Sequence, residues 1–290
     1  MQIKNSVINK SIDYILQHID DDISIEDVAR YCNFSKFYFS RMFKEETGLS
    51  VYNFIKSMKI DQSAVSLKIE KDKTITDIGN NFGYSSSNFS SAFNKEYNIS
   101  PVDFRKSVSI ESTKNPFYSH EQVKFKSFEH YENNISIRNI KDYKVLYERY
   151  IGNYSEIGQN WHSLMERFKQ YINEDTLMIE KSYNDPSISS FNKSVYDLCI
   201  TVNDNISESD DITMKDIIES DNFKIIQGGK FAVYRFDGFV GDIFGSFQGA
   251  FTVWLPRSRY ERDDRFGLGI YRSIDWRNNR VVMDLCIPIK

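Results

Sequence analysis

The chain has few cysteines and no long apolar run. Its three cysteines, Cys32, Cys199 and Cys286, are scattered over 290 residues, and no two form a Cys-x-x-Cys pair. This spacing excludes a disulfide framework and a local zinc or redox pair, so we expect buried thiols. No stretch approaches the roughly 18 uninterrupted apolar residues of a membrane helix, and the N-terminus lacks the apolar core of a signal peptide. We therefore expect a cytoplasmic protein without membrane contact.

An excess of basic charge, the usual footprint of nucleic-acid binding, is also missing. The whole chain carries 37 Lys+Arg, 41 Asp+Glu and a net charge of −4. Residues 1–107 are balanced, with 14 residues of each sign, and the acidic excess lies in the remainder. Balanced charge still permits DNA binding when the basic side chains gather on one face.

Catalytic and metal-binding motifs are absent as well. The sequence has no nucleophile elbow, phosphate loop or flavin fingerprint, and its four histidines form no spaced metal pair. We therefore expect no enzyme activity, no cofactor and no metal.

The strongest positive signal is an internal repeat. Residues 25–35 match residues 75–85 without a gap, and the same offset continues through Phe39 and Phe89. A hydroxyl residue precedes a short amphipathic helix in each copy, and a turn residue and a second helix follow it. The small residues Ala29 and Gly79 lie mid-helix, where two steeply crossing helices need close approach. The sequence therefore predicts two helix-turn-helix units.

The second helix of the first copy has a polar face that suits the DNA major groove. Its candidate DNA-binding residues are Lys36, Phe37, Ser40, Arg41 and Lys44. Arg41 can bind guanine through two hydrogen bonds, and Phe37 can contact a thymine methyl. Lys36 and Lys44 can reach phosphates. A solvated helix face is the alternative interpretation, and the duplicated context favours DNA binding over it.

The second copy offers mainly hydroxyl and amide groups. Its candidate DNA-binding residues are Ser86, Ser87, Asn88, Ser90, Ser91 and Lys95. With fewer cations it should bind more weakly, so we expect the first copy to dominate affinity. A long helical pattern over residues 51–70 would fix the distance between the two copies. The two reading helices could then enter successive major-groove segments on one face of the duplex.

The C-terminal part changes to aromatic-rich, alternating strands. Residues 145–152 parallel residues 231–238, and residues 196–202 parallel residues 283–289. These two matches predict an α+β domain with pseudo-twofold symmetry over residues 135–290. Residues 108–134 are expected to be a linker, and residues 1–107 form the all-α domain.

The N-terminal motifs resemble the AraC/XylS family of regulators. The resemblance rests on residues 25–29, 39–44, 48–50 and 98–105 and covers about the first 107 residues. It implies a seven-helix DNA-binding domain in which residues 36–46 and 86–96 read DNA. The chain departs from the family at Asn98, which often is Gly, and at Ser91 and Asn94, which often are Arg and Lys.

The C-terminal residues resemble the GyrI-like effector domain of Rob-type regulators, on residues 149–152, Trp161, Leu164 and 281–289. The resemblance implies a cleft between the halves that holds a small amphipathic, often cationic, molecule. The candidate ligand-binding residues are Glu148, Tyr150, Tyr154, Trp161, Phe236, Trp254, Tyr271 and Trp276. Aromatic residues in such a domain are more often core, which is the alternative interpretation for each of them. The family often has Glu two residues before Tyr271, where this chain has Gly269, so a neutral or anionic ligand, or none, stays open.

Together these features predict a transcription regulator, expected to be an activator under small-ligand control. Its expected partners are double-stranded DNA and RNA polymerase, and one chain suffices on DNA because it carries two reading helices. Two alternatives stay open: a C-terminal half that binds only protein partners, and a hydrolase that uses Glu148 and Tyr271.

Overall fold

The computed structural model describes all residues except 110, 115–121, 186–187, 189–192, 203–216 and 219. The chain divides into two compact units. Unit 1 contains Met1–Ser109 and Asn184–Ser189, and unit 2 contains Ile110–Tyr183 and Ser190–Lys290. No helix among the described residues has the length and hydropathy needed to cross a membrane.

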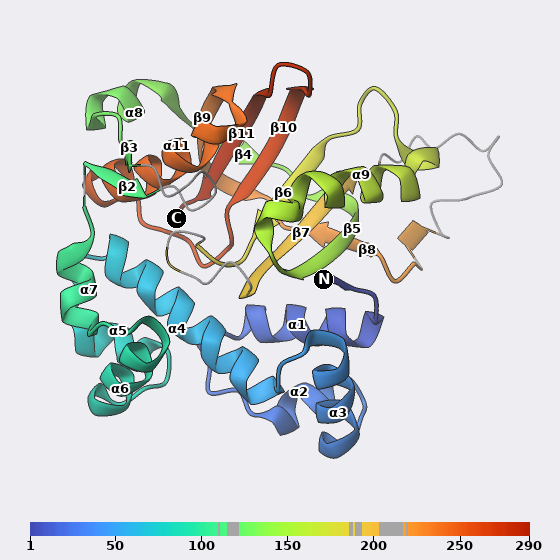
Figure 1. Ribbon diagram of the computed structural model, residues 1–290, viewed down its shortest axis with the longest axis vertical. Coiled ribbons are helices and arrows are strands. Elements are labelled where there is room, and N and C mark those ends of the chain that lie inside the picture. The colour runs from blue at the N-terminus through green and yellow to red at the C-terminus, as the bar shows by residue number, and fades with distance from the viewer. Residues whose placement is uncertain (110, 115–121, 186–187, 189–192, 203–216, 219) are drawn as a thin grey trace. The chain divides into compact units, whose positions relative to one another are not determined.

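The described part of unit 1 is helical apart from the short strand β1 (Gln2–Ile3) (Figure 1). Its helices are α1 (Ser6–Gln17), α2 (Ile25–Tyr31), α3 (Lys36–Thr47), α4 (Val51–Ile69), α5 (Ile75–Asn81), α6 (Ser86–Tyr97) and α7 (Pro101–Ser107). The pairs α2–α3 and α5–α6 are the two predicted helix-turn-helix units, and α4 is the predicted spacer helix.

Local sequence chemistry sets the ends of these helices. Ser24 and Thr74 each accept a hydrogen bond from the third backbone amide of the helix, and an aspartate at that position completes a capping box. The helix α3 ends at Gly48 with a φ of 73°. The helix α6 ends at Asn98 with a φ of 54°, so asparagine fills the left-handed position that favours glycine.

Each helix-turn-helix unit has its own aromatic core. Phe39 and Phe43 of α3 are fully buried and contact each other, and Phe43 packs on Phe54 of α4. Phe89 and Phe93 of α6 hold the equivalent positions in the second helix-turn-helix. The Lys59 ammonium of α4 donates to the backbone oxygens of Asp21, at 2.7 Å, and of Phe82, at 3.3 Å. One buried lysine therefore links the first and the second helix-turn-helix within unit 1 through backbone carbonyls.

The predicted close approach of α5 and α6 occurs at Gly79. A Cβ atom there would lie 2.9 Å from Cγ of Phe89, which is fully buried. We expect Gly79→Ala to lower the free energy of unfolding by about 1–2 kcal/mol, because overpacking outweighs the gain in helix propensity. Gly158→Ala in unit 2 is the matched control, since nothing lies within 4 Å of its Cβ position.

Differential scanning calorimetry of the full chain checks this prediction. The transition of unit 1 should shift down in Gly79→Ala, and Gly158→Ala should leave it unchanged. Equal or higher stability of Gly79→Ala would show that Phe89 repacks without cost.

Unit 2 is built on one antiparallel sheet, β8-β5-β7-β6-β10-β11-β9-β4. Its strands are β4 (Ile135–Ile140), β5 (Tyr143–Gly152), β6 (Met178–Ser182), β7 (Ser194–Thr201), β8 (Phe223–Ile226), β9 (Gly229–Phe239), β10 (Leu268–Asp275) and β11 (Arg280–Pro288). This order is palindromic about the β6–β10 pair, because β4 to β7 and β8 to β11 are the two repeats. The predicted α+β domain with pseudo-twofold symmetry is confirmed.

Each repeat places a helix between its second and third strands. These are α9 (Ile157–Arg167) and α11 (Ile243–Gly249), which pack on β7 and β9 (Figure 1). One face of the sheet carries Tyr150 and Leu198, which pack with residues of α9. The other face carries a second core that includes the buried thiols of Cys199 and Cys286. Burial raises the pKa of both thiols to about 12.

The range 108–134, expected as a linker, contains regular elements of unit 2. These are the strands β2 (Ser112–Lys114) and β3 (Gln122–Lys124), which pair with each other, and the helix α8 (Phe128–Asn134). Tyr131 of α8 is 1% exposed, and a Cβ at Gly249 of α11 would collide with its ring. The sequence gives little sign of this, because a seven-residue polar helix with one buried aromatic has no readable periodicity.

Candidate DNA-reading helices and effector site

The outer face of α3 is formed by the residues predicted to read DNA. Phe37 is 86% exposed, although a side chain of this type is normally buried. The Arg41 side chain is 69% exposed and lies over the Tyr38 ring, 3.9 Å from Glu45. Lys44 is also exposed, and Ser40 is half-buried. Lys36 differs from these because it forms an ion pair with Glu26, so a phosphate would have to compete with that carboxylate.

The outer face of α6 is exposed and nearly uncharged. All six predicted residues, Ser86, Ser87, Asn88, Ser90, Ser91 and Lys95, are exposed. Its buried face holds Phe89, Ala92 and Phe93. The geometry of the two helix-turn-helix units is alike, and the charge they present differs as the sequence predicts.

Three of the predicted ligand-binding residues, Tyr154, Trp161 and Tyr271, come together in unit 2 around a carboxylate that the sequence alone does not single out. Glu180 of β6 accepts hydrogen bonds from the hydroxyls of Tyr154 and of Tyr271, the latter at 2.9 Å. Trp161 of α9 lies edge-on to Tyr271, with ring centroids 5.5 Å apart. Tyr196 of β7 lies edge-on to Tyr154, with ring centroids 5.0 Å apart. We call Glu180, Tyr154, Trp161, Tyr196 and Tyr271 the Glu180 cluster.

The Glu180 cluster is largely buried and rich in aromatic faces. Burial raises the pKa of Glu180 to about 7, and the hydrogen bond from Tyr271 opposes this shift. Burial also raises the pKa of Tyr271, and the neighbouring carboxylate adds to that effect. The Trp161 indole N–H is buried, and no acceptor among the described residues lies in hydrogen-bonding geometry. A partly buried carboxylate among aromatic rings can bind an organic cation by charge and by cation–π attraction.

Glu180 lies beside Gly269, the position at which the family often has a glutamate. The two residues are cross-strand partners in the β6–β10 pair, and a Cβ at Gly269 would lie 3.8 Å from Cβ of Glu180. The carboxylate is therefore on the neighbouring strand and on the same face of the sheet. The strand register could have revealed this, but the register is set by tertiary pairing that no local sequence pattern reports.

The other predicted ligand-binding residues lie elsewhere. Glu148 is 2% exposed, and its carboxylate accepts hydrogen bonds from Arg167 at 2.9 Å and from Tyr150 at 2.5 Å. It shares the core around α9 through Tyr150, which stacks on Tyr196. Glu148 and Tyr271, the pair considered for hydrolysis, thus bind different partners.

The remaining three belong to the second repeat. Phe236 is buried on β9. Trp254 is buried in a π-helical turn, and its indole N–H donates to Glu132 at 2.5 Å. Trp276 lies in the turn between β10 and β11 and is 64% exposed. The structure does not bring these three to the Glu180 cluster.

Comparison with known families finds a matching family model for each of the two parts of the chain. The family model described as a GyrI-like small molecule binding domain matches residues 133–290, more than half of the chain. The chain belongs to the GyrI-like family. A second model, described as a helix-turn-helix domain, matches residues 28–107, and this N-terminal domain is of the AraC type.

Several curated proteins resemble part of this GyrI-like protein. It is 36% identical over 61 residues to the multiple antibiotic resistance protein MarA of Escherichia coli, covering 21% of this chain and 48% of MarA. It is 37% identical over 60 residues to the uncharacterized regulator YbfP of Bacillus subtilis, covering 21% of this chain and 20% of YbfP. The chain thus spans about half or less of the relatives it matches.

Among solved structures, the C-terminal domain of AraT from Geobacillus stearothermophilus is 30% identical, with a TM-score of 0.34. That match covers 35% of this chain and 84% of AraT's. The C-terminal domain of EcmrR is 12% identical, with a TM-score of 0.42 over 54% of this chain and 96% of that one.

Proposed function

We propose that this protein is a transcription regulator that binds double-stranded DNA through α3 and α6 and responds to a small organic cation held by the Glu180 cluster. The duplicated helix-turn-helix, with an exposed arginine, lysine and phenylalanine on α3, supports the DNA-binding half of the proposal. The partly buried carboxylate within an aromatic cluster supports the ligand half.

Within this proposal, α3 supplies most of the binding energy. Arg41 would contact a guanine, Lys44 a phosphate and Phe37 a thymine methyl. The polar side chains of α6 would add hydrogen bonds without much charge. One chain carries both reading helices, so we propose that a monomer occupies each operator and activates transcription together with RNA polymerase.

A fluorescence-anisotropy titration tests DNA binding. The full chain is titrated against promoter DNA from its own locus and against scrambled DNA at two salt concentrations. We expect selective binding to the promoter, with a shallow salt dependence because few cations face the DNA. Equal, weak and steeply salt-dependent binding to both duplexes would contradict a sequence-specific regulator.

A thermal-shift screen of organic cations distinguishes two hypotheses: that the C-terminal half binds a small ligand, and that it binds only protein partners. A ligand that binds the folded state raises its stability by mass action, by about 2.7 kcal/mol at 100 times its Kd. We expect aromatic quaternary ammonium compounds to stabilise unit 2. A screen without any hit, together with retention of RNA polymerase by the C-terminal half, would favour the protein-binding alternative.

A further inference from the structure

The repeat in unit 2 places an arginine–aspartate pair at the same position in both halves. Arg149 on β5 faces Asp197 on β7, and Arg235 on β9 faces Asp284 on β11. In the first half this pair is closed. Arg149 and Asp197 are both 0% exposed and joined by hydrogen bonds of 2.7 and 2.9 Å, with Lys224 also on the carboxylate.

In the second half the aspartate is again buried, but its arginine partners are partly exposed and outnumber it. Asp284 is 2% exposed and is approached by Arg235 at 2.5 Å, Arg272 at 2.7 Å and Arg138 at 3.7 Å. The three arginine side chains are 47%, 33% and 44% exposed. Within the described part of the chain, every ion pair of these arginines is with Asp284. Three guanidinium groups thus share one carboxylate, which leaves two positive charges uncompensated.

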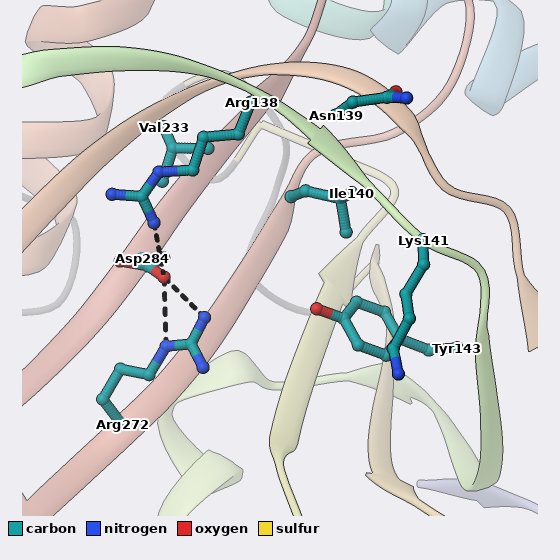
Figure 2. A pocket seen from close by; sticks show the side chains of 8 residues that line it. All are labelled: Arg138, Asn139, Ile140, Lys141, Tyr143, Val233, Arg272 and Asp284. Atoms are coloured by element: carbon teal, nitrogen blue, oxygen red, sulfur yellow. Dashed lines mark hydrogen bonds and ion pairs between the residues drawn. The ribbon is translucent and has the colours of Figure 1, made fainter.

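Arg138, Arg272 and Asp284 line a pocket of about 240 Å³ together with Lys141, whereas Arg235 is not one of the lining residues. Figure 2 shows Arg138 and Arg272 reaching the Asp284 carboxylate from two sides, with Tyr143 and Lys141 across the pocket. Arg272 uses Nε and Nη2 on one carboxylate oxygen, at 3.0 and 2.7 Å, which fixes the plane of its guanidinium. The buried Asp284 therefore orients Arg272, while the Nε of Arg138 donates to the hydroxyl of Ser136 at 2.9 Å.

The backbone supports this arrangement. The register of the β10–β11 pair shifts between Tyr271 and Ser273, so Arg272 is the extra residue of a β-bulge. Bulges re-aim a side chain out of the regular alternation. Asp284 pairs with Ile270 and Glu180 with Gly269, so the two carboxylates lie on opposite faces of the sheet. The arginine pocket is thus separate from the Glu180 cluster.

We propose that this pocket binds a small molecule that carries a phosphate monoester. Guanidinium forks match phosphate oxygens through paired hydrogen bonds. A phosphate monoester carries close to two negative charges at neutral pH, which balances the lining of the pocket, where Arg138, Arg272 and Lys141 outnumber Asp284 by two. The pocket is smaller than the roughly 300–1,000 Å³ of drug-sized sites, which favours a compact ligand. This proposal does not depend on DNA binding or on the Glu180 cluster.

Isothermal titration of the full chain with inorganic phosphate, at constant ionic strength, tests it. We expect saturable one-to-one binding, weakened about tenfold or more by Arg138→Gln and by Arg272→Gln, since each removes charge-assisted hydrogen bonds. Arg272→Lys keeps a cation beside Asp284 and should fold, but it lacks the fork and should also bind more weakly. Arg277→Gln, an exposed arginine in the turn of the same hairpin, is the control and should bind like the wild type.

Two outcomes would overturn the proposal: no saturable binding by the wild type, or unchanged binding in both Arg272 variants. A comparison of phenyl phosphate with dimethyl phosphate separates a monoester from a nucleic-acid backbone. We expect phenyl phosphate to bind about tenfold more tightly, because only it is a dianion. Equal or tighter binding of dimethyl phosphate would reject the monoester and point to a phosphodiester.

Discussion

Arg41→Ala should weaken binding to the cognate operator by about 1–3 kcal/mol, roughly five- to 150-fold, and relax the preference at one base pair. The Arg41 guanidinium is 69% exposed, and its contact with Glu45, at 3.9 Å, is too long to hold it strongly. It can therefore turn to a guanine at little cost, and no other cation of α3 or α6 occupies its place. Anisotropy titrations against the operator and against single-base variants measure both effects.

Two companion variants separate base reading from charge. Arg41→Lys keeps the positive charge and loses the paired hydrogen bonds, so it should lose selectivity at the same base pair while retaining most of its affinity for scrambled DNA. Lys95→Ala in α6 should weaken binding to all sequences alike and reduce the salt dependence. Equal losses on operator and scrambled DNA for Arg41→Ala and Lys95→Ala would defeat these assignments.

The helices of unit 1 could be predicted from sequence because each is defined locally. Ser24 and Thr74 cap α2 and α5, and the apolar spacing of Phe39 and Phe43 fixes which face of α3 is buried. The fifty-residue repeat then supports each assignment twice. The link that the Lys59 ammonium makes between the two helix-turn-helix pairs cannot be predicted from sequence, since its partners are backbone carbonyls distant in sequence.

The candidate sites of unit 2 depend on pairing between strands and could be predicted only in part. The sequence identifies Tyr154, Trp161 and Tyr271 as candidates, but it offers Glu148 as the acidic group of the site. That residue is instead held by Arg167 and Tyr150. Glu180 comes into the cluster because β6 pairs with β10, and Trp276 lies apart because the β10–β11 hairpin extends beyond the cluster. Neither fact can be read from the periodicity of a single strand.

Glu180→Gln should weaken the binding of an aromatic quaternary ammonium, with benzyltrimethylammonium as the probe, by at least about tenfold. The variant keeps the shape of the side chain and an acceptor for the tyrosine hydroxyls, but it removes the charge that attracts the cation. Isothermal titration with the full chain measures the change, and the neutral carbon isostere of the probe should bind wild type and variant alike. Glu148→Gln is the comparison for the alternative carboxylate and should leave binding unchanged.

The same carboxylate makes cation binding depend on pH. Burial raises the pKa of Glu180 from 4.5 to about 7, so the free protein holds a proton there that the unfolded chain has lost. Glu180 therefore lowers the stability of the free protein as pH rises from 4.5 to about 7. Cation affinity should rise as Glu180 ionises around its pKa of about 7, by about tenfold between pH 6 and pH 8. A flat pH profile in the wild type, or the same profile in Glu180→Gln, would show that another group controls binding.

Moving the carboxylate from β6 to β10 gives the strictest test of whether the site needs only a negative charge among the aromatic rings. In the double variant Glu180→Gln with Gly269→Glu, the new side chain starts 3.8 Å from Cβ of Glu180 and on the same face. Its Cβ would lie 2.8 Å from the terminal methyl of Met283, a flexible group that can move aside. We therefore expect the double variant to recover most of the cation affinity lost in Glu180→Gln. A folded double variant that fails to recover it would mean that Glu180 acts through its specific bonds to Tyr154 and Tyr271 rather than by placing a negative charge among the aromatic rings.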